Sequence, residues 1–372
     1  MKILHTSDLH LGFSLNNVSF IEDQRIMINS LIDIIKSNGI NAVLICGDIF
    51  DRSVSSPAAI SLYDDMCTRI CLDINVPVLI CAGNHDGAAR LSSCSDLLRR
   101  SGLYIAGRIT DNTPPVEFAD TVFHFMPYFT IDEARSMFPE SGIKSYTDAV
   151  KRYADSIELV KNKRNILLAH IFAAGSETCD SDKHAYVGGT SAVPVNLFEK
   201  FDYVALGHLH KPQTIKNVRY SGTPLKYSFS EANHKKSATI INTADMTVTT
   251  ADIPSVRDMR VIRGTYDEVT AFTETDTNRD DYIKIELSDR FPSALIDRQF
   301  TEIYPNLLRC TGKSVVSHQN AVSVTADELT EMTAMDVLAR YCSEVAEIDL
   351  DEEMIAWFNE AVNKTDGRGE NV

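Results

Sequence analysis

The chain has 372 residues, enough for one large domain and a smaller one, or for two domains. An apolar content of 44% and a mean hydropathy of −0.12 are ordinary for a soluble protein with a buried core. No apolar stretch reaches the roughly 18 residues that a membrane span needs, and the apolar run at Ile3 is too short for a signal peptide. We therefore expect a cytoplasmic protein without membrane contact.

The net charge of −16 argues at first against a nucleic-acid partner, but the charge is unevenly distributed. Residues 255–372 hold 12 Lys and Arg against 24 Asp and Glu, whereas residues 1–254 hold 24 against 28. Several acids of the front part are candidate metal ligands, and bound cations would offset them. The charge therefore permits a phosphate-binding groove there without predicting one.

Strand and helix signals alternate from residue 1 to about residue 200, which indicates an α/β layered domain. Helical patterns are expected at about 20–38, 56–72, 88–101 and 145–162. From about residue 202 the signals become short strands, expected at 203–206, 213–220, 238–242 and 247–253.

A boundary is expected at Ile253-Pro254-Ser255, so residues 1–254 form the first predicted domain. The second, a small α+β domain over residues 255–325, should contain strands at 260–264, 282–287 and 306–310, a helix at 292–300 and a final loop at 316–325. Helical patterns at about 326–345 and 350–363 then predict a C-terminal helical region over residues 326–372.

Five polar clusters each follow a β-type apolar run within the first 210 residues. They are Asp8-Leu9-His10, Gly47-Asp48-Ile49-Phe50-Asp51, Gly83-Asn84-His85-Asp86, Ala169-His170 and Gly207-His208-Leu209-His210. Because the clusters follow five strands, we expect them to meet at one rim of one sheet.

Seven of these side chains are candidate metal ligands, enough for two divalent metals. They are Asp8, His10, Asp48, Asn84, His170, His208 and His210. The carboxylate of Asp48 could bridge the metals with one oxygen on each. Oxygen and imidazole donors without thiolate suit Mn²⁺, Fe, Zn²⁺ or Mg²⁺, and the imidazole share disfavours Mg²⁺ and Ca²⁺. Two-metal sites typically act on phosphate esters, so the pattern predicts a binuclear metallohydrolase.

His85 is the candidate general acid, because it neighbours Asn84 but need not bind metal. The alcohol leaving group of a phosphodiester needs a proton, and a group that titrates near neutrality is suited to supply it. Asp51 or Asp86 could orient the imidazole.

The clusters D-x-H, G-D-x-x-D, G-N-H-D, a lone H after a strand, and G-H-x-H resemble, in this order, the calcineurin-like metallophosphoesterase superfamily. The resemblance implies a four-layer α/β/β/α sandwich followed by a smaller C-terminal α+β cap domain. It also implies that metal one takes Asp8, His10, Asp48 and His210. Metal two would take Asp48, Asn84, His170 and His208.

Three further stretches are similar to the bacterial SbcD family: K-I-L-H-T-S-D-L-H-L-G at the N-terminus, G-D-I-F-D-R, and S-G-T-P-L-K-Y-S-F-S-E at 221–231. This resemblance implies a DNA exonuclease and endonuclease that uses two divalent metal ions, Mn²⁺ being the expected species, in DNA repair, recombination and replication. The implied partners are DNA, the SMC-like ATPase SbcC and a second copy of the chain within a heterotetramer. Archaeal relatives carry a His where Asp51 stands, which leaves the role of Asp51 open.

Two other functions stay open at this point: another binuclear metallophosphoesterase that acts on nucleotides, small phosphoesters or phosphoproteins, and a scaffold without activity. The intact ligand set disfavours the scaffold. Lys226 and Tyr227 are candidates for a substrate groove, whereas His5 and His124 are expected to pack in the core. The helix at 350–363 either folds back onto the cap or docks on the ATPase.

Overall fold

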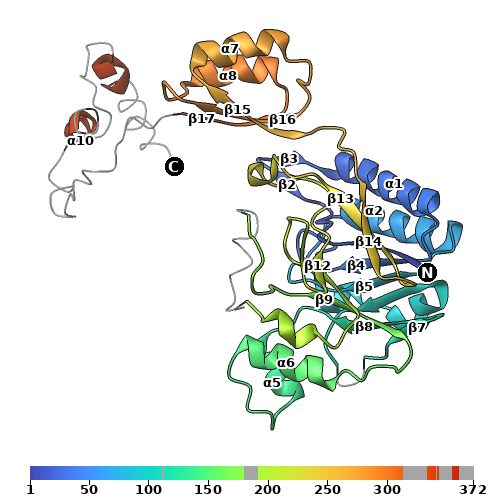
Figure 1. Cartoon of the computed structure of the whole chain (residues 1–372). Coiled ribbons are helices and arrows are strands. Elements are labelled where there is room, and N and C mark those ends of the chain that lie inside the picture. Colours follow the sequence, from blue (N-terminus) through green and yellow to red (C-terminus); the bar gives the residue numbers. More distant parts are fainter. Residues whose placement is uncertain (111–112, 180–191, 313–332, 341, 343–353, 360–372) are drawn as a thin grey trace. The chain divides into compact units, whose positions relative to one another are not determined.

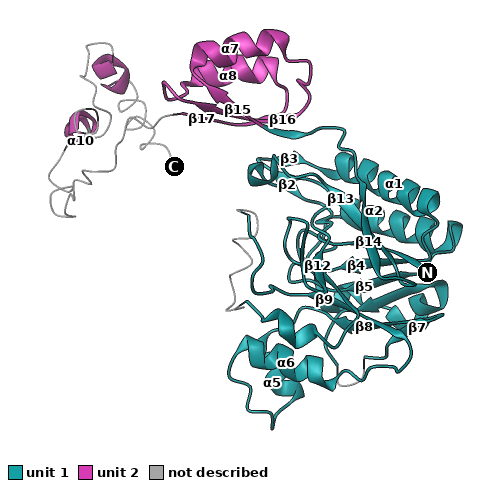
Figure 2. Ribbon diagram, viewed as in Figure 1, with its two compact units in different colours: residues 1–260 teal, residues 261–372 magenta. Residues whose placement is uncertain are grey.

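The computed structural model describes residues 1–110, 113–179, 192–312, 333–340, 342 and 354–359. The chain forms two compact units, Met1–Arg260 and Val261–Val372 (Figure 2). This division lies a few residues beyond the expected boundary at residue 254. The further division into 255–325 and 326–372 stays a prediction.

Unit 1 contains two six-stranded sheets of mainly parallel strands. The first has the order β14-β13-β1-β4-β5-β6, formed by β1 (Lys2–Thr6), β4 (Ala42–Cys46), β5 (Val78–Cys81), β6 (Leu103–Ala106), β13 (Ser237–Asn242) and β14 (Thr247–Asp252). The second has the order β11-β12-β10-β9-β8-β7, formed by β7 (Val116–Phe118), β8 (Thr121–Met126), β9 (Arg164–His170), β10 (Tyr203–Gly207), β11 (Gln213–Ile215) and β12 (Val218–Tyr220). The strand expected at 213–220 is thus a hairpin, with Lys216 in the left-handed conformation at its turn.

Helices cover the outer faces of both sheets, so unit 1 has the α/β/β/α layers that the resemblance implied (Figure 1). They are α1 (Ile21–Asn38) and α2 (Pro57–Thr68) with the π-helical turn η1 (Arg69–Asp73) beside the first sheet, and α5 (Ile131–Met137) and α6 (Tyr146–Ser156) beside the second. The helix expected at 88–101 is broken into α3 (Ala88–Leu91), α4 (Ser95–Leu98) and the 3₁₀ turn η2 (Arg99–Ser101). The break falls at Cys94, whose φ of 58° is incompatible with a continuing right-handed helix.

The main core lies between the two sheets. Ile3, Leu44 and Leu79 of the first sheet pack with Phe123 and Ile166 of the second, and all are fully buried. Because helices cover the other faces, the central strands are buried on both sides, which explains their continuous apolar runs. Each fully buried aliphatic side chain contributes roughly 1.5–3 kcal/mol of stability, so the stack holds the strand ends in fixed positions.

Residues 259–312, most of them in unit 2, form a three-stranded sheet of order β15-β16-β17 with the helices α7 and α8, an α+β arrangement. Its elements are β15 (Met259–Gly264), α7 (Tyr266–Thr275), β16 (Tyr282–Leu287), α8 (Ala294–Ile303) and β17 (Leu307–Gly312). The sequence pattern missed α7, although the capping box of Thr265 and Glu268 marks its start. Phe300 and Tyr304 fill its small core with Ile283.

The C-terminal region is described only at residues 333–340, which include α10 (Ala334–Arg340), at Cys342 and at the helical residues 354–359. The rest of the helices expected at 326–345 and 350–363, and the loop expected at 316–325, lie outside the described residues. Among the helices that can be described, none is long and apolar enough to cross a membrane.

Candidate metal centre

The seven predicted ligands come together, but from two sheets rather than from one. Those of the first three clusters follow β1, β4 and β5 of the first sheet, and those of the last two end or follow β9 and β10 of the second. The expectation of a single sheet was wrong because strands of both sheets carry the same apolar pattern. The carboxyl ends of the stacked sheets meet at one edge of the sandwich, and the site lies there.

Four of the site residues adopt the left-handed backbone conformation that side chains usually avoid. The φ angles are 52° for Asp8, 43° for His10, 50° for Asp48 and 103° for His208. Such conformations cost about 1–3 kcal/mol each and persist only where the surroundings enforce them. Here the amide of Asp8 donates to the carbonyl of Gly47 at 3.0 Å, and the amide of His208 donates to the Asp8 carboxylate at 3.0 Å.

Two motif glycines are required because side chains of the site lie directly against them. A Cβ on Gly47 would lie 2.1 Å from His170 Nδ1, and a Cβ on Gly83 would lie 2.2 Å from Asp48 Oδ1. Any other residue at these positions would displace a candidate ligand.

The first half of the centre holds Asp8, His10 and His210, whose ligand atoms lie within 4.8 Å of one another. Asp48 Oδ2 lies 3.9 Å from His10 Nε2. These are the residues that the resemblance assigned to metal one.

The second half holds Asn84, His170 and His208. Asn84 Oδ1 lies 2.9 Å from His170 Nε2 and 3.0 Å from His208 Nδ1, and the two imidazole nitrogens are 3.3 Å apart. Asp48 Oδ2 lies 3.4 Å from His170 Nε2. Asp48 therefore stands between the two halves, as a bridging carboxylate would.

The donor set fits divalent cations. Both ring nitrogens of His10 are buried and have no hydrogen-bond partner within the described part of the chain. A buried polar group without a partner costs about 1–3 kcal/mol, which a bound cation would relieve. In the second half, Asn84 Oδ1, His170 Nε2 and His208 Nδ1 lie within hydrogen-bond distance of one another. A cation between them could bind the lone pairs of all three atoms. The residues present could hold two ions with mixed oxygen and nitrogen ligands.

Burial and mutual proximity perturb the ionisation of the ligands. Burial raises the pKa of Asp8 to about 6 and lowers the pKa of His10 and of His208 to about 3. Burial would also lower the pKa of His170, but the Asp48 carboxylate outweighs it and raises that pKa to about 10. Burial disfavours the charged form of Asp48, yet His170 holds its pKa well below the usual value. Asp48 thus keeps a negative charge at the centre of the site.

His85 lies beside the first half, with its ring centroid 4.9 Å from that of His10. Its Nδ1 donates to the backbone carbonyl of Asp51 at 2.8 Å, which leaves Nε2 for the substrate. The main chain of Asp51, not its carboxylate as expected, therefore orients the imidazole. His10, Asp51 and His85 also offer ligand atoms within 4.8 Å of one another, so a role of His85 as a ligand needs a direct test.

Asp86 joins two loops instead of orienting His85. Its carboxylate accepts hydrogen bonds from the amides of Gly83 at 2.8 Å, Phe50 at 3.0 Å and Ile49 at 3.3 Å. Burial, with the nearby Asp48 charge, raises its pKa to about 7. The loops after β4 and β5 are thus held together beneath Asn84.

The two substrate-groove candidates lie elsewhere than expected. Tyr227 is only 3% exposed and donates its hydroxyl to the carbonyl of Leu9, so it stabilises the loop that carries Asp8 and His10. Lys226 forms an ion pair with Asp258 at 2.7 Å and has an 11% exposed side chain. Neither side chain is available to line a groove, because the polar atoms of both are held by protein partners.

Sequence reasoning missed two residues that support the ligands. Gln24 donates to the carbonyl of His10 at 2.7 Å and accepts from the amide of Gly12 at 2.9 Å. Glu231 is fully buried and lies 3.0 Å from His210 Nδ1. A signal for Glu231 existed, because it ends the stretch 221–231 that carried the resemblance.

The histidines expected in the core are found there. His5 lies 3.1 Å from the hydroxyl of Tyr203 and 3.2 Å from the carbonyl of Leu206, and His124 lies 3.0 Å from Asn165. These contacts account for both rings without a metal.

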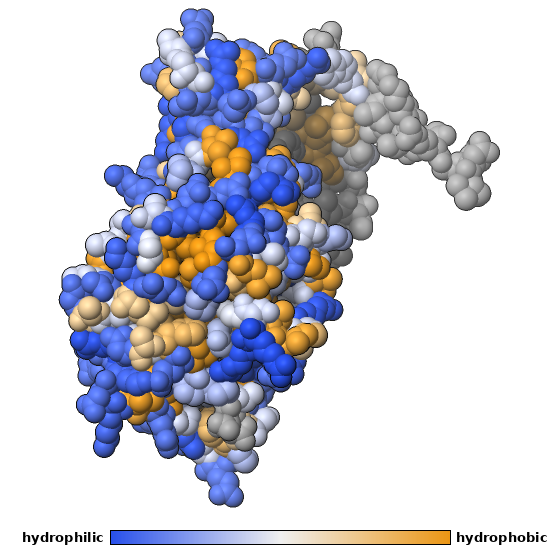
Figure 3. Space-filling model, turned by 90° about the vertical axis from the view of Figure 1, so that its right-hand side faces the viewer, coloured by the Kyte–Doolittle hydropathy of each residue, from blue (hydrophilic) through white to orange (hydrophobic). Residues whose placement is uncertain are grey.

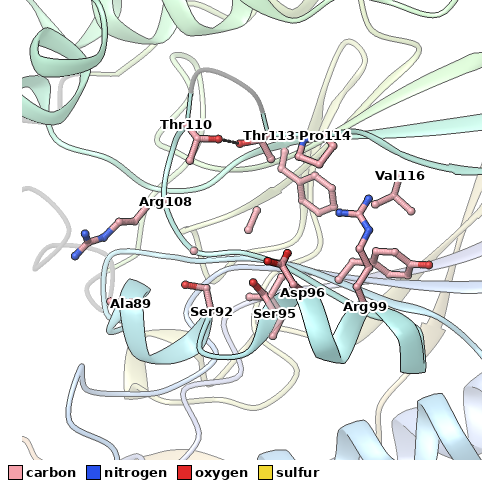
Figure 4. Close-up of a pocket in the computed structure, with 15 residues that line it drawn as sticks. Ala89, Ser92, Ser95, Asp96, Arg99, Arg108, Thr110, Thr113, Pro114 and Val116 are labelled. Atoms are coloured by element: carbon pink, nitrogen blue, oxygen red, sulfur yellow. Dashed lines mark hydrogen bonds between the residues drawn. The ribbon is translucent and has the colours of Figure 1, made fainter.

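A separate cavity of about 460 Å³ lies beside β6, away from the ligands (Figure 4). Ser92, Ser95 and Asp96 line it from the helical turns, and Thr110 and Thr113, joined by a 2.8 Å hydrogen bond, line it from the opposite side. None of the predicted site residues lines this cavity, so it is not the candidate metal centre.

Comparisons with known proteins give two family matches. The family model for calcineurin-like phosphoesterases matches residues 1–212. The model SbcD_C, described as the type 5 capsule protein repressor C-terminal domain, matches residues 255–346.

The chain is also similar to several solved structures. The protein TT1561 of Thermus thermophilus is 11% identical with a TM-score of 0.41, over 68% of this chain and 99% of that chain. Yfce, a phosphoesterase from E. coli, is 12% identical with a TM-score of 0.27, over 68% and 100%. GAP50, the anchor in the inner membrane complex of Plasmodium, is 10% identical with a TM-score of 0.35, over 88% and 98%.

Proposed function

The chain belongs to the calcineurin-like phosphoesterase family and is an SbcD-type metallophosphoesterase, and from this premise we propose that it is a metal-dependent DNA nuclease. Its family makes it a hydrolase of phosphoesters. One observation carries the proposal of activity: Asp48 and six further oxygen and imidazole donors come together from five strand ends. The match over residues 255–346 supports DNA as the substrate.

The side chains have separate tasks in this proposal. Asp8, His10, Asp48 and His210 would hold one ion, and Asp48, Asn84, His170 and His208 the other. When bound, two divalent ions supply an activated water and neutralise charge on the phosphoryl oxygens. Mn²⁺ is the ion that we propose.

His85 would deliver the proton to the leaving oxygen. The carbonyl of Asp51 accepts from its Nδ1, so a proton carried on Nε2 is the one available for transfer. The neighbouring ring of His10 faces His85 at an interplanar angle of 88°, which restricts the orientation of the His85 ring. The imidazole of His85 is thus held in one orientation beside the proposed ligands.

The proposed partners are DNA, an SMC-like ATPase of the SbcC type and a second copy of the chain. The C-terminal helical residues 354–359 support a protein partner, because Trp357 is 69% exposed and Ile355 is 36% exposed. Unit 1 also exposes apolar side chains, among them Val54, Ile60, Leu72 and Leu97, and Figure 3 shows apolar groups among hydrophilic ones on the face in view.

We propose that the complex acts on cytoplasmic DNA in repair, recombination and replication.

The direct test is a hydrolysis assay with Mn²⁺ on linear, hairpin and circular DNA, with and without the ATPase. An aryl phosphomonoester serves as the competing substrate. We expect cleavage of linear and hairpin DNA at rates well above those of the phosphomonoester. Efficient turnover of the phosphomonoester alone would favour the alternative, a metallophosphoesterase for nucleotides, small phosphoesters or phosphoproteins.

Deleting residues 346–372 tests the contact with the ATPase. We expect weaker binding to the ATPase, with metal content and basal nuclease activity unchanged, because unit 1 holds all the proposed ligands. Full affinity of the truncated protein for the ATPase would exclude this segment as the contact.

A further inference from the structure

The carboxylate of Glu231, at the end of η5 (Phe229–Glu231), contacts polar groups of three residues within the described part of the chain. Its Oε1 lies 3.0 Å from His210 Nδ1, and its Oε2 accepts from Thr223 Oγ1 at 3.1 Å and from Lys236 Nζ at 2.5 Å. The side chains of Glu231 and Lys236 are 0% and 1% exposed. A buried ion pair of this kind needs additional hydrogen bonds to be tolerated, and the site supplies them.

The same two residues, Thr223 and Lys236, also hold the backbone of His210. The amide of Thr223 and the ammonium of Lys236 each donate to the carbonyl of His210 at 3.2 Å. Thr223 and Lys236 therefore fix the position of His210 at the main chain while they fix the carboxylate behind its ring.

The charge of Glu231 determines the tautomer of His210. Glu231 Oε2 accepts from the buried Lys236 ammonium and from Thr223 Oγ1, which favours the ionised carboxylate. An ionised carboxylate only accepts hydrogen bonds, so His210 Nδ1 carries the hydrogen. The lone pair of His210 is then on Nε2, and this imidazole offers a ligand atom within 4.8 Å of those of Asp8 and His10.

The second half of the centre has a neutral counterpart. His170 Nδ1 donates to the backbone carbonyl of Cys46 at 2.9 Å, which fixes the tautomer without a charge. Of these two candidate ligands, His210 is therefore backed by a carboxylate and His170 by a backbone carbonyl.

We propose that Glu231 is a positioning residue for metal one, which fixes the Nδ1–H tautomer of His210 and raises the basicity of its Nε2. The proposal rests on the proposed two-metal function. Carboxylates behind a metal-binding imidazole act in this way, and their removal typically lowers metal affinity about 10–100-fold. The effect should be confined to one of the two ions, because Glu231 contacts only the His210 side of the centre among the described ligands.

The test is a calorimetric titration of Mn²⁺ into the metal-free full-length protein. Glu231→Ala should weaken one site by about 10–100-fold and leave the other unchanged. Because Glu231→Ala leaves the Lys236 charge buried and unpaired, the double variant Glu231→Gln/Lys236→Met removes both charges together and should also weaken one site. Glu199→Gln is the matched control, since Glu199 is 58% exposed and paired with Lys216, and both sites should keep their affinity.

A second readout follows the histidine itself. Side-chain ¹⁵N NMR of metal-free protein should show His210 as the Nδ1–H tautomer in the wild type and as a mixture in Glu231→Ala. Unchanged affinities at both sites, equal weakening of both sites, or a His210 tautomer that does not respond would each overturn the inference. A wild type that binds fewer than two ions would instead overturn the proposed function, and the inference with it.

Discussion

In the half of the centre that holds Asp8, His10 and His210, a buried carboxylate, Glu231, stands behind an imidazole, whereas in the half that holds His170 a backbone carbonyl does so. The first half depends on side chains that come from distant parts of the sequence. The second depends on the main chain of the strands themselves. The two halves have similar ligand types, but different groups hold their imidazoles in position. A substitution behind one imidazole should therefore change metal binding in that half and not in the other.

Asp48→Ala should have the largest effect, because Asp48 is the one ligand assigned to both halves. His170 and His10 would lose the carboxylate that lies 3.4 Å and 3.9 Å away. We expect loss of both ions and of measurable nuclease activity, monitored by metal analysis and DNA hydrolysis. Retention of two ions would show that Asp48 is not a bridge.

His85→Ala should lower kcat about 10²–10⁴-fold, the usual contribution of a general acid, while both ions stay bound. The measurement combines metal analysis with kcat on linear DNA. If His85→Ala loses an ion, then His85 is a ligand together with His10 and Asp51, and its assignment as proton donor is wrong.

Tyr227→Phe tests the support of the first half. The hydroxyl of Tyr227 donates to Leu9, between two ligands, and accepts from Gln24 at 3.2 Å. Removing it should cost about 1–3 kcal/mol of unfolding free energy, because a buried carbonyl loses a partner. Urea unfolding gives this value, and KM for DNA should stay unchanged. A raised KM for DNA without a loss of unfolding free energy would indicate instead that Tyr227 contacts the substrate.

His5→Gln should have the smallest effect on activity, and it should change how the free energy of unfolding depends on pH. Burial, with the positive charge of Arg219, lowers the pKa of His5 from its ordinary 6.5 to about 3. Below pH 6.5 the unfolded chain therefore binds a proton at His5, whereas the folded protein binds it only near pH 3. The contribution of His5 to the free energy of unfolding is thus fully present above pH 6.5 and falls as the pH drops toward 3. One such group contributes about 1.4 kcal/mol per pH unit.

Unfolding of the metal-free wild type and of His5→Gln between pH 5 and pH 7.5 provides the comparison. The wild type should lose more stability on acidification than the variant does. Parallel curves would mean that His5 is not held neutral between the sheets.

The strand ends of the site were predictable because the ligands lie at or shortly after short apolar runs that are typical of buried strands. Asp48 after Ala42–Cys46 and His170 at the end of Arg164–His170 are examples. The assignment of strands to two sheets was not predictable, since both sheets are buried on both faces and carry the same pattern. The α/β class was predicted from the alternation of strand and helix signals and the four-layer arrangement from the resemblance, and the family match confirms the fold class.

The residues that hold the ligands in position could not be predicted from the sequence. Glu231 lies 21 positions from His210, and the hydroxyl of Tyr227 reaches a carbonyl 218 positions away. Such contacts depend on tertiary packing, which local patterns do not encode. For the same reason Lys226 and Tyr227 were misassigned, because only the fold shows that their polar atoms are used inside the protein.

A crystal structure of the full chain with Mn²⁺, with anomalous scattering data, tests the central claim most directly. The account predicts two anomalous peaks about 3.5–4 Å apart, with Asp48 bound to both, His210 bound to one and His170 bound to the other. A single peak, or two peaks that do not share Asp48, would contradict the two-metal centre.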